Sequence, residues 1–478
     1  MLTLEQVERY RNDIVAFAEE CYYLPLTKQP IRLEKHQKRI LRHVFRRDKE
    51  GKFPYDTVIY SCPKKSGKTE IASLVGLWLA LTEEPYNEVY ALANDFEQAR
   101  GRVFKAMGRA CLTSPLLRGA ARAGHREILF PSTGTTITAL ASEYAGAAGA
   151  NPGLTLWDEL WGYVSEASHR LWEEMTPVPT RHNSIRVIVT YAGWEGESEL
   201  LWNLYLKGVG PEENPKGQGQ KVKALEDLPS WENGRLFVYW DHEPRMPWQK
   251  PEYYEEQRAS LRTNAFLRMH GNMWVGTEEA FVEMGWWDKC VDADHRPLLP
   301  TKKVSLTIGV DVGIKHDSAA VVAVYYDRVM SKVVLANHRT WQPSPKEPLD
   351  IEATIEAHLL SLSENYRLSK VLYDPYQFHR SAITLRSQGL PLEEYPQSVS
   401  NLTQMGQNLY ELIKGGNLLG YEDAGLRRAI SHTVAKETSR GWRLTKEKAA
   451  HKIDIVVALA MASFGAIQMP RPPSFYFL

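Results

Sequence analysis

The chain has 478 residues, of which 43% are hydrophobic and 24% are charged. At roughly 150 residues per domain this length predicts two or three domains, and the composition excludes a disordered or collagenous protein. Lysine plus arginine and aspartate plus glutamate are balanced at 58 each, so the overall charge does not indicate a nucleic-acid partner, and any such partner must be recognised by local patches.

Segments that would direct the chain to a membrane or out of the cell are not evident. The longest suspicious apolar stretch, residues 455–467, is about thirteen residues long, whereas a bilayer span needs about 20. The first residues lack the pattern of an export signal. The four cysteines form no C-x-x-C pair, which argues against a zinc ribbon. We expect a protein of the cytoplasm with reduced thiols.

Strands and helices alternate in the first half, which predicts an α/β domain over residues 1–205. Strands are expected at 56–61, 88–93, 128–130, 135–140, 154–157 and 185–190, and helices from 67 and over 97–111. Residues 208–221 break every periodicity and are expected to form a loop or linker. The following stretch is rich in Trp, Glu and Pro, so we expect a connecting region over 206–300.

The second half follows another order, which predicts a second domain over residues 301–478. Strands are expected at 304–311, 319–326, 332–340, 370–374 and 392–395, and helices at 349–366, 378–388, 402–414 and 449–467. Three strands in a row followed by alternating helices and strands are the plan of an RNase H-like domain.

A phosphate-binding loop is predicted between the first expected strand and its helix. Residues 61–69 read Ser-Cys-Pro-Lys-Lys-Ser-Gly-Lys-Thr, which departs from G-x-x-x-x-G-K-[ST] only where Cys62 replaces the first glycine. Backbone N–H groups at a helix N-terminus hold phosphate, Lys68 can reach the outer phosphates, and Thr69 can bind Mg²⁺. The residues predicted to bind ATP here are Cys62, Pro63, Lys64, Lys65, Ser66, Gly67, Lys68 and Thr69.

Two acids at the end of the strand 154–157 are the predicted partners of this loop. Asp158 would hold the Mg²⁺ ion of the nucleotide, and Glu159 would polarise the attacking water. Taken alone, an apolar strand followed by two acids is as typical of a helix cap. Gln37, in an early amphipathic helix, is the candidate for reading adenine, and Thr190 ends a strand that would lie beside the loop.

Three aspartates in the second half interrupt or end apolar segments, where a charge is costly unless it is paired or bound to a metal. Asp311 and Asp374 end expected strands, and Asp454 begins the last apolar helix. Carboxylates from separate elements that converge at one edge of a sheet can hold two Mg²⁺ ions for phosphodiester hydrolysis. Asp317 is either a fourth ligand or a turn residue.

The stretch from Arg427 to Lys452 is basic, with eight Lys or Arg against Glu437 and Glu447. It lies next to Asp454 in the sequence, so we expect it to contact DNA backbone phosphates. The candidates are Arg440, Arg443, Lys446 and Lys448.

Taken together, these motifs resemble the large terminase subunit of tailed bacteriophages over nearly the whole chain. The resemblance rests on Gln37, the loop ending in Ser66 to Thr69, the segment Ala93 to Ala99, the pair Asp158 and Glu159, and the coupling segment near Thr190. It continues through the segments VDVGIKHDSAA, LYDP and KIDIVVALA, which carry Asp311, Asp374 and Asp454.

The resemblance implies an N-terminal P-loop ATPase domain of the RecA or ASCE type and a C-terminal RNase H-like nuclease. ATP with Mg²⁺ would drive translocation of double-stranded DNA into a procapsid, and Mg²⁺ or Mn²⁺ would support cleavage of concatemeric DNA. The implied partners are DNA, a portal protein, a small terminase subunit and further copies in a ring, which is a pentamer when docked and a monomer in solution. The implied place of action is the cytoplasm of the host.

One feature of the family is not assigned. An arginine that reaches a neighbour's γ-phosphate is expected shortly before the acid pair, but residues 129–159 contain no Arg or Lys. The nearest candidates are Arg100, Arg102, Arg122 and Arg126.

Three alternatives remain at this point. A helicase-like DNA translocase would share the ATP site but should carry a second RecA-like domain. A recombination nuclease or transposase would share the second domain without needing the phosphate loop. A DNA-binding assembly protein with remnant sites would not need Lys68, Glu159 and the three aspartates.

Overall fold

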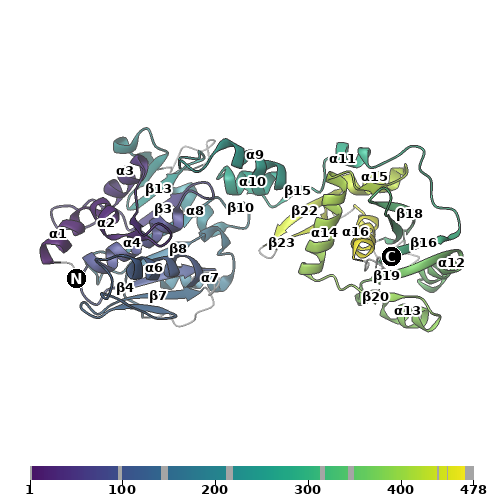
Figure 1. Cartoon of the computed structure of the whole chain (residues 1–478), viewed down its shortest axis with the longest axis horizontal. Coiled ribbons are helices and arrows are strands. Elements are labelled where there is room, and N and C mark those ends of the chain that lie inside the picture. Colours follow the sequence, from purple (N-terminus) through teal and green to yellow (C-terminus); the bar gives the residue numbers. More distant parts are fainter. Residues whose placement is uncertain are drawn as a thin grey trace, which may run out of the picture. The chain divides into compact units, whose positions relative to one another are not determined.

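The computed structural model describes residues 3–94, 100–141, 149–210, 219–312, 318–342, 349–438, 441–448 and 451–468. The chain divides into two compact units, Met1–Gly276 and Thr277–Leu478 (Figure 1). Residues 206–300, which we expected to form a connecting region, are therefore shared between the two units. The physical reason is that strands within this region pair with sheets of both units.

A ten-stranded sheet forms the centre of the first unit. In sheet order its strands are β11 (Gln220–Lys221), β12 (Ser230–Asn233), β13 (Leu236–Trp240), β3 (Thr57–Ser61), β9 (Ile185–Thr190), β8 (Pro152–Asp158), β4 (Glu88–Ala93), β7 (Thr135–Ala141), β6 (Glu127–Phe130) and β5 (Arg122–Ala123). The strands from β13 to β7 are parallel, so their carboxyl ends lie along one edge.

Helices cover both faces of this sheet. One face packs against α4 (Lys68–Thr82), whose side chains are buried on almost every side, and against α1 (Leu4–Asn12), α2 (Ile14–Cys21), α3 (Lys35–Val44) and α6 (Lys105–Thr113). The other face packs against α7 (Glu166–Glu174) and α8 (Glu199–Gly208). A parallel sheet with two apolar faces requires such a double cover.

The tryptophan-rich stretch after α8 is part of this unit, not a connector. β12 and β13 extend the sheet beside β3. The rings of Trp202, Tyr205, Trp240 and Trp274 pack against one another with centroids 4.6–5.7 Å apart. The apolar run Leu236–Trp240 is a buried strand, which local sequence alone does not distinguish from a turn of buried helix.

Shorter elements complete the first unit. They are β1 (Tyr23–Leu24), β2 (Gln29–Pro30), η1 (Arg100–Phe104), η2 (Leu160–Gly162), β10 (Trp194–Glu195), η3 (Lys223–Leu225), α9 (Pro251–Ser260), α10 (Thr263–His270) and β14 (Val275–Gly276).

The second unit is built on a six-stranded sheet. In sheet order its strands are β20 (Leu392–Glu394), β19 (Tyr366–Tyr373), β16 (Thr301–Asp311), β17 (Ala319–Asp327), β18 (Lys332–Trp341) and β21 (Leu418–Leu419). β16, β17 and β18 are antiparallel, and β19 and β20 run parallel to β16. This is the RNase H-like plan predicted from the sequence.

Helices again cover both faces of the second sheet. α11 (Met284–Lys289), α14 (Val399–Lys414), α15 (Ala424–Ser431) and α16 (Asp454–Ile467) lie on one face, and η4 (Glu352–Glu356), α12 (Ala357–Asn365) and α13 (Pro375–Ser387) on the other. The last helix was expected from residue 449, but it begins at Asp454. No helix in the described parts of the chain is long and apolar enough to cross a membrane.

A three-stranded sheet accompanies these layers and was not expected from the sequence. It consists of β15 (Glu278–Ala280), β22 (Thr433–Thr438) and β23 (Gly441–Lys446). β22 and β23 form a hairpin within the basic stretch, because Ala435, Trp442 and Leu444 alternate with charged residues and pack on the core.

Candidate nucleotide and metal sites

The loop of residues 62–67 joins the buried strand β3 to the N-terminus of α4. Lys65 and Gly67 have positive φ angles of 71° and 80°, the left-handed region that such a tight loop requires. Lys68 is buried, and its Nζ donates to the carbonyl oxygens of Cys62 at 2.9 Å and Pro63 at 3.3 Å. The ammonium group therefore lies against the loop that it is predicted to serve.

The replacement of the consensus glycine by Cys62 is accommodated locally. The Cys62 Sγ lies 2.8 Å from the Ser66 Oγ, which donates to the Pro63 carbonyl oxygen at 2.7 Å. Burial raises the pKa of the Cys62 thiol to about 11, so the thiol stays neutral. The side chain closes the base of the loop and leaves its length unchanged.

The sheet register brings the acid pair to the same edge as the loop. β9 lies between β3 and β8, with Ser61 opposite Thr190 and Val189 opposite Asp158. A strand inserted between the loop strand and the acidic strand is the RecA or ASCE arrangement predicted for the first domain.

Asp158 is buried, with 6% of its surface exposed, and its Oδ2 accepts no hydrogen bond from the described residues. The Arg102 Nη1 lies 3.8 Å from this oxygen. Burial and the neighbouring Glu159 raise the pKa of Asp158. A buried carboxylate oxygen without a donor is costly and is relieved by a bound cation, so Asp158 fits the predicted role of holding Mg²⁺.

Glu159 is held in a strained backbone conformation, with φ at 56°. Its N–H donates to the Val189 carbonyl oxygen at 2.9 Å, and its Oε2 accepts from the Trp161 Nε1 at 2.8 Å. Burial raises the pKa of Glu159, while Lys68 is the strongest influence that lowers it. The side chain is therefore oriented before any substrate arrives.

Gln37 and Thr190 lie in elements that flank the loop strand. Gln37 is buried at the start of α3, and its Oε1 accepts from the backbone N–H of Glu34 at 3.0 Å, as in a capping box. Thr190 ends β9, and its Oγ1 donates to the Tyr191 carbonyl oxygen at 2.8 Å. These contacts are structural, and the roles in adenine reading and coupling remain predictions.

The sequence did not reveal a segment that supports the loop from outside. The Trp248 indole Nε1 donates to the Lys65 carbonyl oxygen at 2.7 Å, and the Lys64 N–H donates to the Met269 carbonyl oxygen at 2.7 Å. The Gln249 Nε2 donates to the Lys64 carbonyl oxygen at 3.2 Å. The loop is thus fixed by residues almost two hundred positions further along the chain.

Asn272 is the hub of this support. Its buried Oδ1 accepts from the Ser61 Oγ at 3.0 Å and from the Ala192 N–H at 2.7 Å, and its Nδ2 donates to the Asp241 carbonyl oxygen at 2.8 Å. It thereby joins the ends of β3, β9 and β13. Its positive φ of 52° is tolerated best by Asn and Gly, so the Gly-Asn pair was the only available sequence signal.

The three aspartates of the second unit lie at one edge of its sheet. Asp311 ends β16, and Asp374 follows the adjacent parallel strand β19, with Val310 opposite Tyr373. Asp454 begins α16, which packs on β16 and β17. Gly309 allows this approach, since a Cβ there would lie 2.1 Å from the Ala458 carbonyl oxygen.

The partners of these carboxylates are polar side chains and a backbone N–H. The Gln397 Nε2 donates to the Asp311 Oδ1 at 3.0 Å, and the Ser318 hydroxyl donates to the Asp454 Oδ2. The Asp374 Oδ1 accepts from the Tyr376 N–H at 3.4 Å. Neither Gln397 nor Ser318 was predicted, because both follow loops whose course is set by the sheet.

Carboxylate oxygens are the donors that Mg²⁺ and Mn²⁺ take, so the chemistry of the edge fits the predicted ions. Among the residues that the structure describes, however, no three His, Cys, Asp or Glu side chains are close enough to hold one ion. The structure thus places the three aspartates at a common edge without gathering them into one ligand sphere. Asp317 lies outside the described residues.

Comparison with known proteins was made for sequence and for structure. No protein-family profile matches the chain, and no curated protein matches it. Among solved structures, a full-length large terminase from a thermophilic bacteriophage has a TM-score of 0.53 at 13% identity, over 90% of this chain and 98% of that chain.

The chain has the fold of a bacteriophage large terminase. The large terminase of bacteriophage HK97 also matches, with a TM-score of 0.42 at 16% identity, over 95% of this chain and 99% of that chain. The terminase nuclease from thermophilic phage G20c, with bound magnesium, matches 38% of this chain and 95% of its own, with a TM-score of 0.31 at 20% identity.

The predicted DNA-contacting residues fall in and after the hairpin of this terminase fold. Arg443 is exposed on β23, Lys446 is half-buried and Lys448 is exposed, while Arg440 lies outside the described residues. Opposite Arg443, Lys436 forms an ion pair with Glu278 at 3.1 Å. Exposed cations fit phosphate contacts, which remain a prediction.

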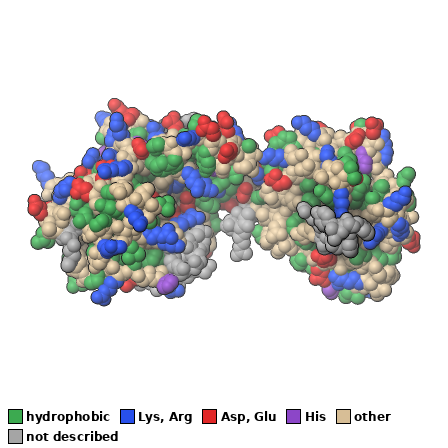
Figure 2. All heavy atoms as spheres, in the orientation of Figure 1, with side chains coloured by type: hydrophobic (Ala, Val, Ile, Leu, Met, Phe, Trp, Pro, Cys, Tyr) green, Lys and Arg blue, Asp and Glu red, His purple; other side chains and the backbone are tan. Residues whose placement is uncertain are grey.

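The basic stretch around α3 behaves differently. Its cations are paired with acids: Lys38 with Glu19, Arg39 with Asp227, Arg42 with Asp13 and Arg47 with Glu83. On the face shown in Figure 2, positive and negative side chains are interspersed over the first unit. The stretch is a solvated helix face that contributes to packing.

The arginine candidates of the terminase fold are now distinguished by position. Arg102, in η1, lies beside Asp158, with half of its side chain exposed. Arg122 and Arg126 are exposed at the other side of the sheet, on and near β5. The side chain of Arg100 lies outside the described residues. Arg102 is thus the candidate that stands at the acid pair of its own chain.

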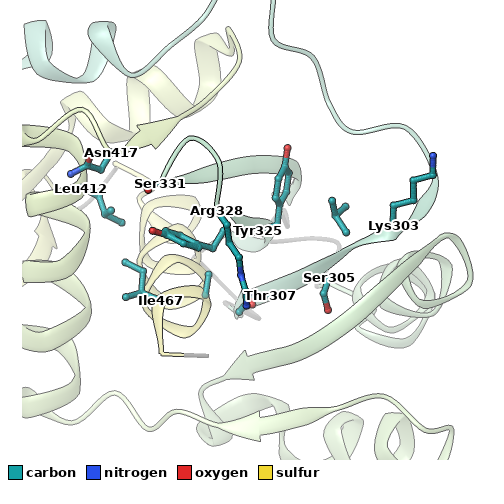
Figure 3. A pocket seen from close by; sticks show the side chains of 12 residues that line it. Lys303, Ser305, Thr307, Tyr325, Arg328, Ser331, Leu412, Asn417 and Ile467 are labelled. Carbon is teal, nitrogen blue, oxygen red and sulfur yellow. The ribbon is translucent and has the colours of Figure 1, made fainter. Parts of the chain in front are cut away.

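A cavity of about 930 Å³ lies in the second unit, away from the aspartates. Its lining includes Lys303 and Thr307 from β16 and Ile467 from the end of α16 (Figure 3). Asp311 and Asp454 occupy the opposite ends of these two elements. The cavity is therefore separate from the candidate metal site.

Proposed function

We propose that the chain is the large subunit of a phage terminase, an ATPase and nuclease that moves viral double-stranded DNA into a procapsid and cuts concatemeric DNA. The observation that carries the proposal is the register of β3, β9 and β8, which sets Lys68 and the acid pair at one edge of a terminase-like fold.

The first unit would act as the ATPase. Backbone N–H groups of residues 62–67 and the Lys68 ammonium would bind the phosphates, and Gln37 would contact adenine. Thr69 and Asp158 would hold Mg²⁺, which neutralises phosphate charge when bound. Glu159, aimed by Trp161, would accept a proton from the attacking water. Thr190 would couple this site to movement.

The second unit would act as the nuclease. Asp311, Asp374 and Asp454, with Asp317 as a further candidate, would hold Mg²⁺ or Mn²⁺, which activates water for phosphodiester cleavage. Gln397 would hold the Asp311 carboxylate in place through its hydrogen bond. Arg440, Arg443, Lys446 and Lys448 would bind backbone phosphates of the DNA.

The partners follow from this role. The chain would act in the cytoplasm of the host with double-stranded DNA, a portal protein and a small terminase subunit. It would be a monomer in solution and a pentameric ring on the procapsid. The full-length thermophilic-phage terminase has been solved with ADP and with ATP-γ-S, and the G20c nuclease with magnesium and with cobalt, and the proposal assigns ATP and Mg²⁺ to this chain.

A crossed experiment tests the proposal. Wild type, Glu159→Ala and Asp311→Ala are assayed for ATP hydrolysis and for cutting of plasmid DNA with Mg²⁺ or Mn²⁺. We expect Glu159→Ala to bind ATP without turning it over and to keep cutting, and Asp311→Ala to show the reverse. Loss of both activities in either variant, with the fold intact, would contradict the assignment of the two sites to two units.

A helicase-like translocase or a recombination nuclease remains the alternative function. A helicase should carry a second RecA-like domain, whereas the second unit has an RNase H-like sheet. A recombination nuclease has no need for the loop with Lys68. DNA-stimulated ATP hydrolysis without any metal-dependent cutting would favour the translocase.

A further inference from the structure

One buried arginine of the first unit is enclosed by aromatic rings. Arg268, on α10, is 6% exposed. Its guanidinium carbon lies 4.3 Å from the ring centre of Trp161, 4.5 Å from that of Trp194 and 5.1 Å from that of Tyr191. Its Nη1 donates to the Ala192 carbonyl oxygen at 3.4 Å. A desolvated cation is stabilised by ring faces in this way.

Two of these rings contact the groups proposed to turn over ATP. Trp161 donates from its indole N–H to the Glu159 carboxylate at 2.8 Å. The Tyr191 ring centre lies 5.1 Å from the Lys68 Nζ. The Trp161 and Tyr191 rings are stacked, with centroids 5.8 Å apart and planes at 29°. One guanidinium thus touches the neighbours of both Glu159 and Lys68.

The helix that carries Arg268 is anchored on both sides of the site. Its Met269 carbonyl oxygen accepts from the Lys64 N–H, and its Asn264 Nδ2 donates to the Gly276 carbonyl oxygen at 3.0 Å. β14, which follows α10, pairs with β10 directly after the rings of Tyr191 and Trp194. The position of the guanidinium is therefore fixed by the backbone around it.

We propose that Arg268 is a positioning residue of the ATPase, which holds Trp161 and Tyr191 and, through them, the Glu159 carboxylate and the Lys68 ammonium. The inference rests on the proposed ATPase function and adds a residue to it. Arginine suits the position better than lysine because its planar guanidinium can stack on several rings at once.

The expected effect is on turnover and not on binding. Phosphate affinity comes mainly from the loop N–H groups, which Arg268 does not contact. Activation of water requires the Glu159 carboxylate at hydrogen-bond distance, and a displacement of about 1 Å can cost on the order of 100-fold in rate. A half-buried Trp161 without the guanidinium over its face is free to take other rotamers.

The first test compares Arg268→Met, Arg268→Lys and Arg258→Met. Arg258 is the matched control, because its guanidinium carbon lies 5.0 Å from the Phe266 ring centre but it is exposed and away from the loop. We expect Arg268→Met to lower kcat for ATP by about 10- to 100-fold with KM within about threefold. Arg268→Lys should recover part of kcat, and Arg258→Met should match wild type.

A double-mutant cycle decides whether Arg268 acts through Trp161. Trp161→Phe keeps an aromatic ring but removes the N–H that binds Glu159. If Arg268 works by aiming that N–H, Arg268→Met should lower kcat much less in the Trp161→Phe background than in wild type. Fully additive losses would overturn the proposal, and so would a rise in KM at constant kcat.

The failure of this inference is distinguishable from that of the proposed function. A wild-type chain that neither binds nor hydrolyses ATP would remove the ATPase assignment itself. If wild type hydrolyses ATP and the correctly folded Arg268→Met variant keeps its kcat, only the positioning role is wrong. The unfolding temperature of each variant separates loss of turnover from loss of fold.

Discussion

The two candidate sites of the chain are built in opposite ways. The nucleotide site is buried and complete in its protein parts, because one loop and three adjacent parallel strands bring Lys68, Asp158 and Glu159 together. The aspartate edge of the second unit is half-exposed and takes one carboxylate from each of three elements. Strand register alone determines the first site, whereas the second also depends on how closely a helix packs.

The difference has a physical basis in what each site binds. A nucleotide brings an extended triphosphate, for which a rigid ring of N–H groups is an advantage before binding. Carboxylates that await metal ions repel one another, so their final approach is favoured only when the ions are present. We therefore expect the nucleotide site to be preformed and the nuclease site to be completed by its metal.

The largest expected effect is at the preformed site. Replacing Lys68 by Ala removes the buried ammonium that lies against the loop, and we expect ATP hydrolysis to fall by at least about 100-fold, as for loss of one preorganised charge at a transferring phosphate. Metal-dependent DNA cutting should be unchanged. Lys223→Ala, at an exposed position of the same unit, is the control for steady-state ATPase kinetics. Equal loss in both activities would show that the units are not independent.

The packing of α16 on β16 gives the next effect. Gly309→Ala places a methyl group against the Ala458 backbone, so we expect destabilisation by about 1–3 kcal/mol and loss of DNA cutting as Asp454 moves away. Gly285→Ala is the matched control in the same unit, because nothing lies near its added Cβ. Thermal unfolding and plasmid cutting measure the two consequences. An unchanged Gly309→Ala variant would mean that α16 is not close to the strand.

Gln397 tests whether polar partners hold the aspartate edge before the metal does. Gln397→Ala removes the hydrogen bond to Asp311, and we expect cutting to fall by about tenfold at limiting Mg²⁺, by analogy with the loss of groups that orient metal ligands. Excess Mg²⁺ should restore part of the activity. Gln404→Ala on the exposed side of α14 should behave as wild type in the same metal titration.

The smallest effect is expected for the exposed cations of the hairpin. Arg443→Ala removes one predicted phosphate contact, so DNA affinity should fall severalfold at low salt and the dependence of log affinity on log salt should become shallower by about one. Arg380→Ala, on the opposite face of the second sheet, is the control in a fluorescence-anisotropy titration. An unchanged salt slope would leave Arg443 as solvated surface.

The sequence by itself determined the parts of this protein that are local. Residues 61–69 between a strand and a helix, the acids after β8, and the order of strands in the second unit follow from periodicity and spacing, and the structure has them in the expected elements. These features depend on contacts between near neighbours in the chain, which composition and hydrophobic pattern encode directly.

Only the tertiary structure decided what depends on distant residues. The membership of β12 and β13 in the first sheet, the clamp of Asn272 on three strand ends and the ring box around Arg268 join positions that are far apart in the sequence. The same holds for Gln397 beside Asp311. No local pattern specifies such contacts, because they arise only when separate elements are packed into one core.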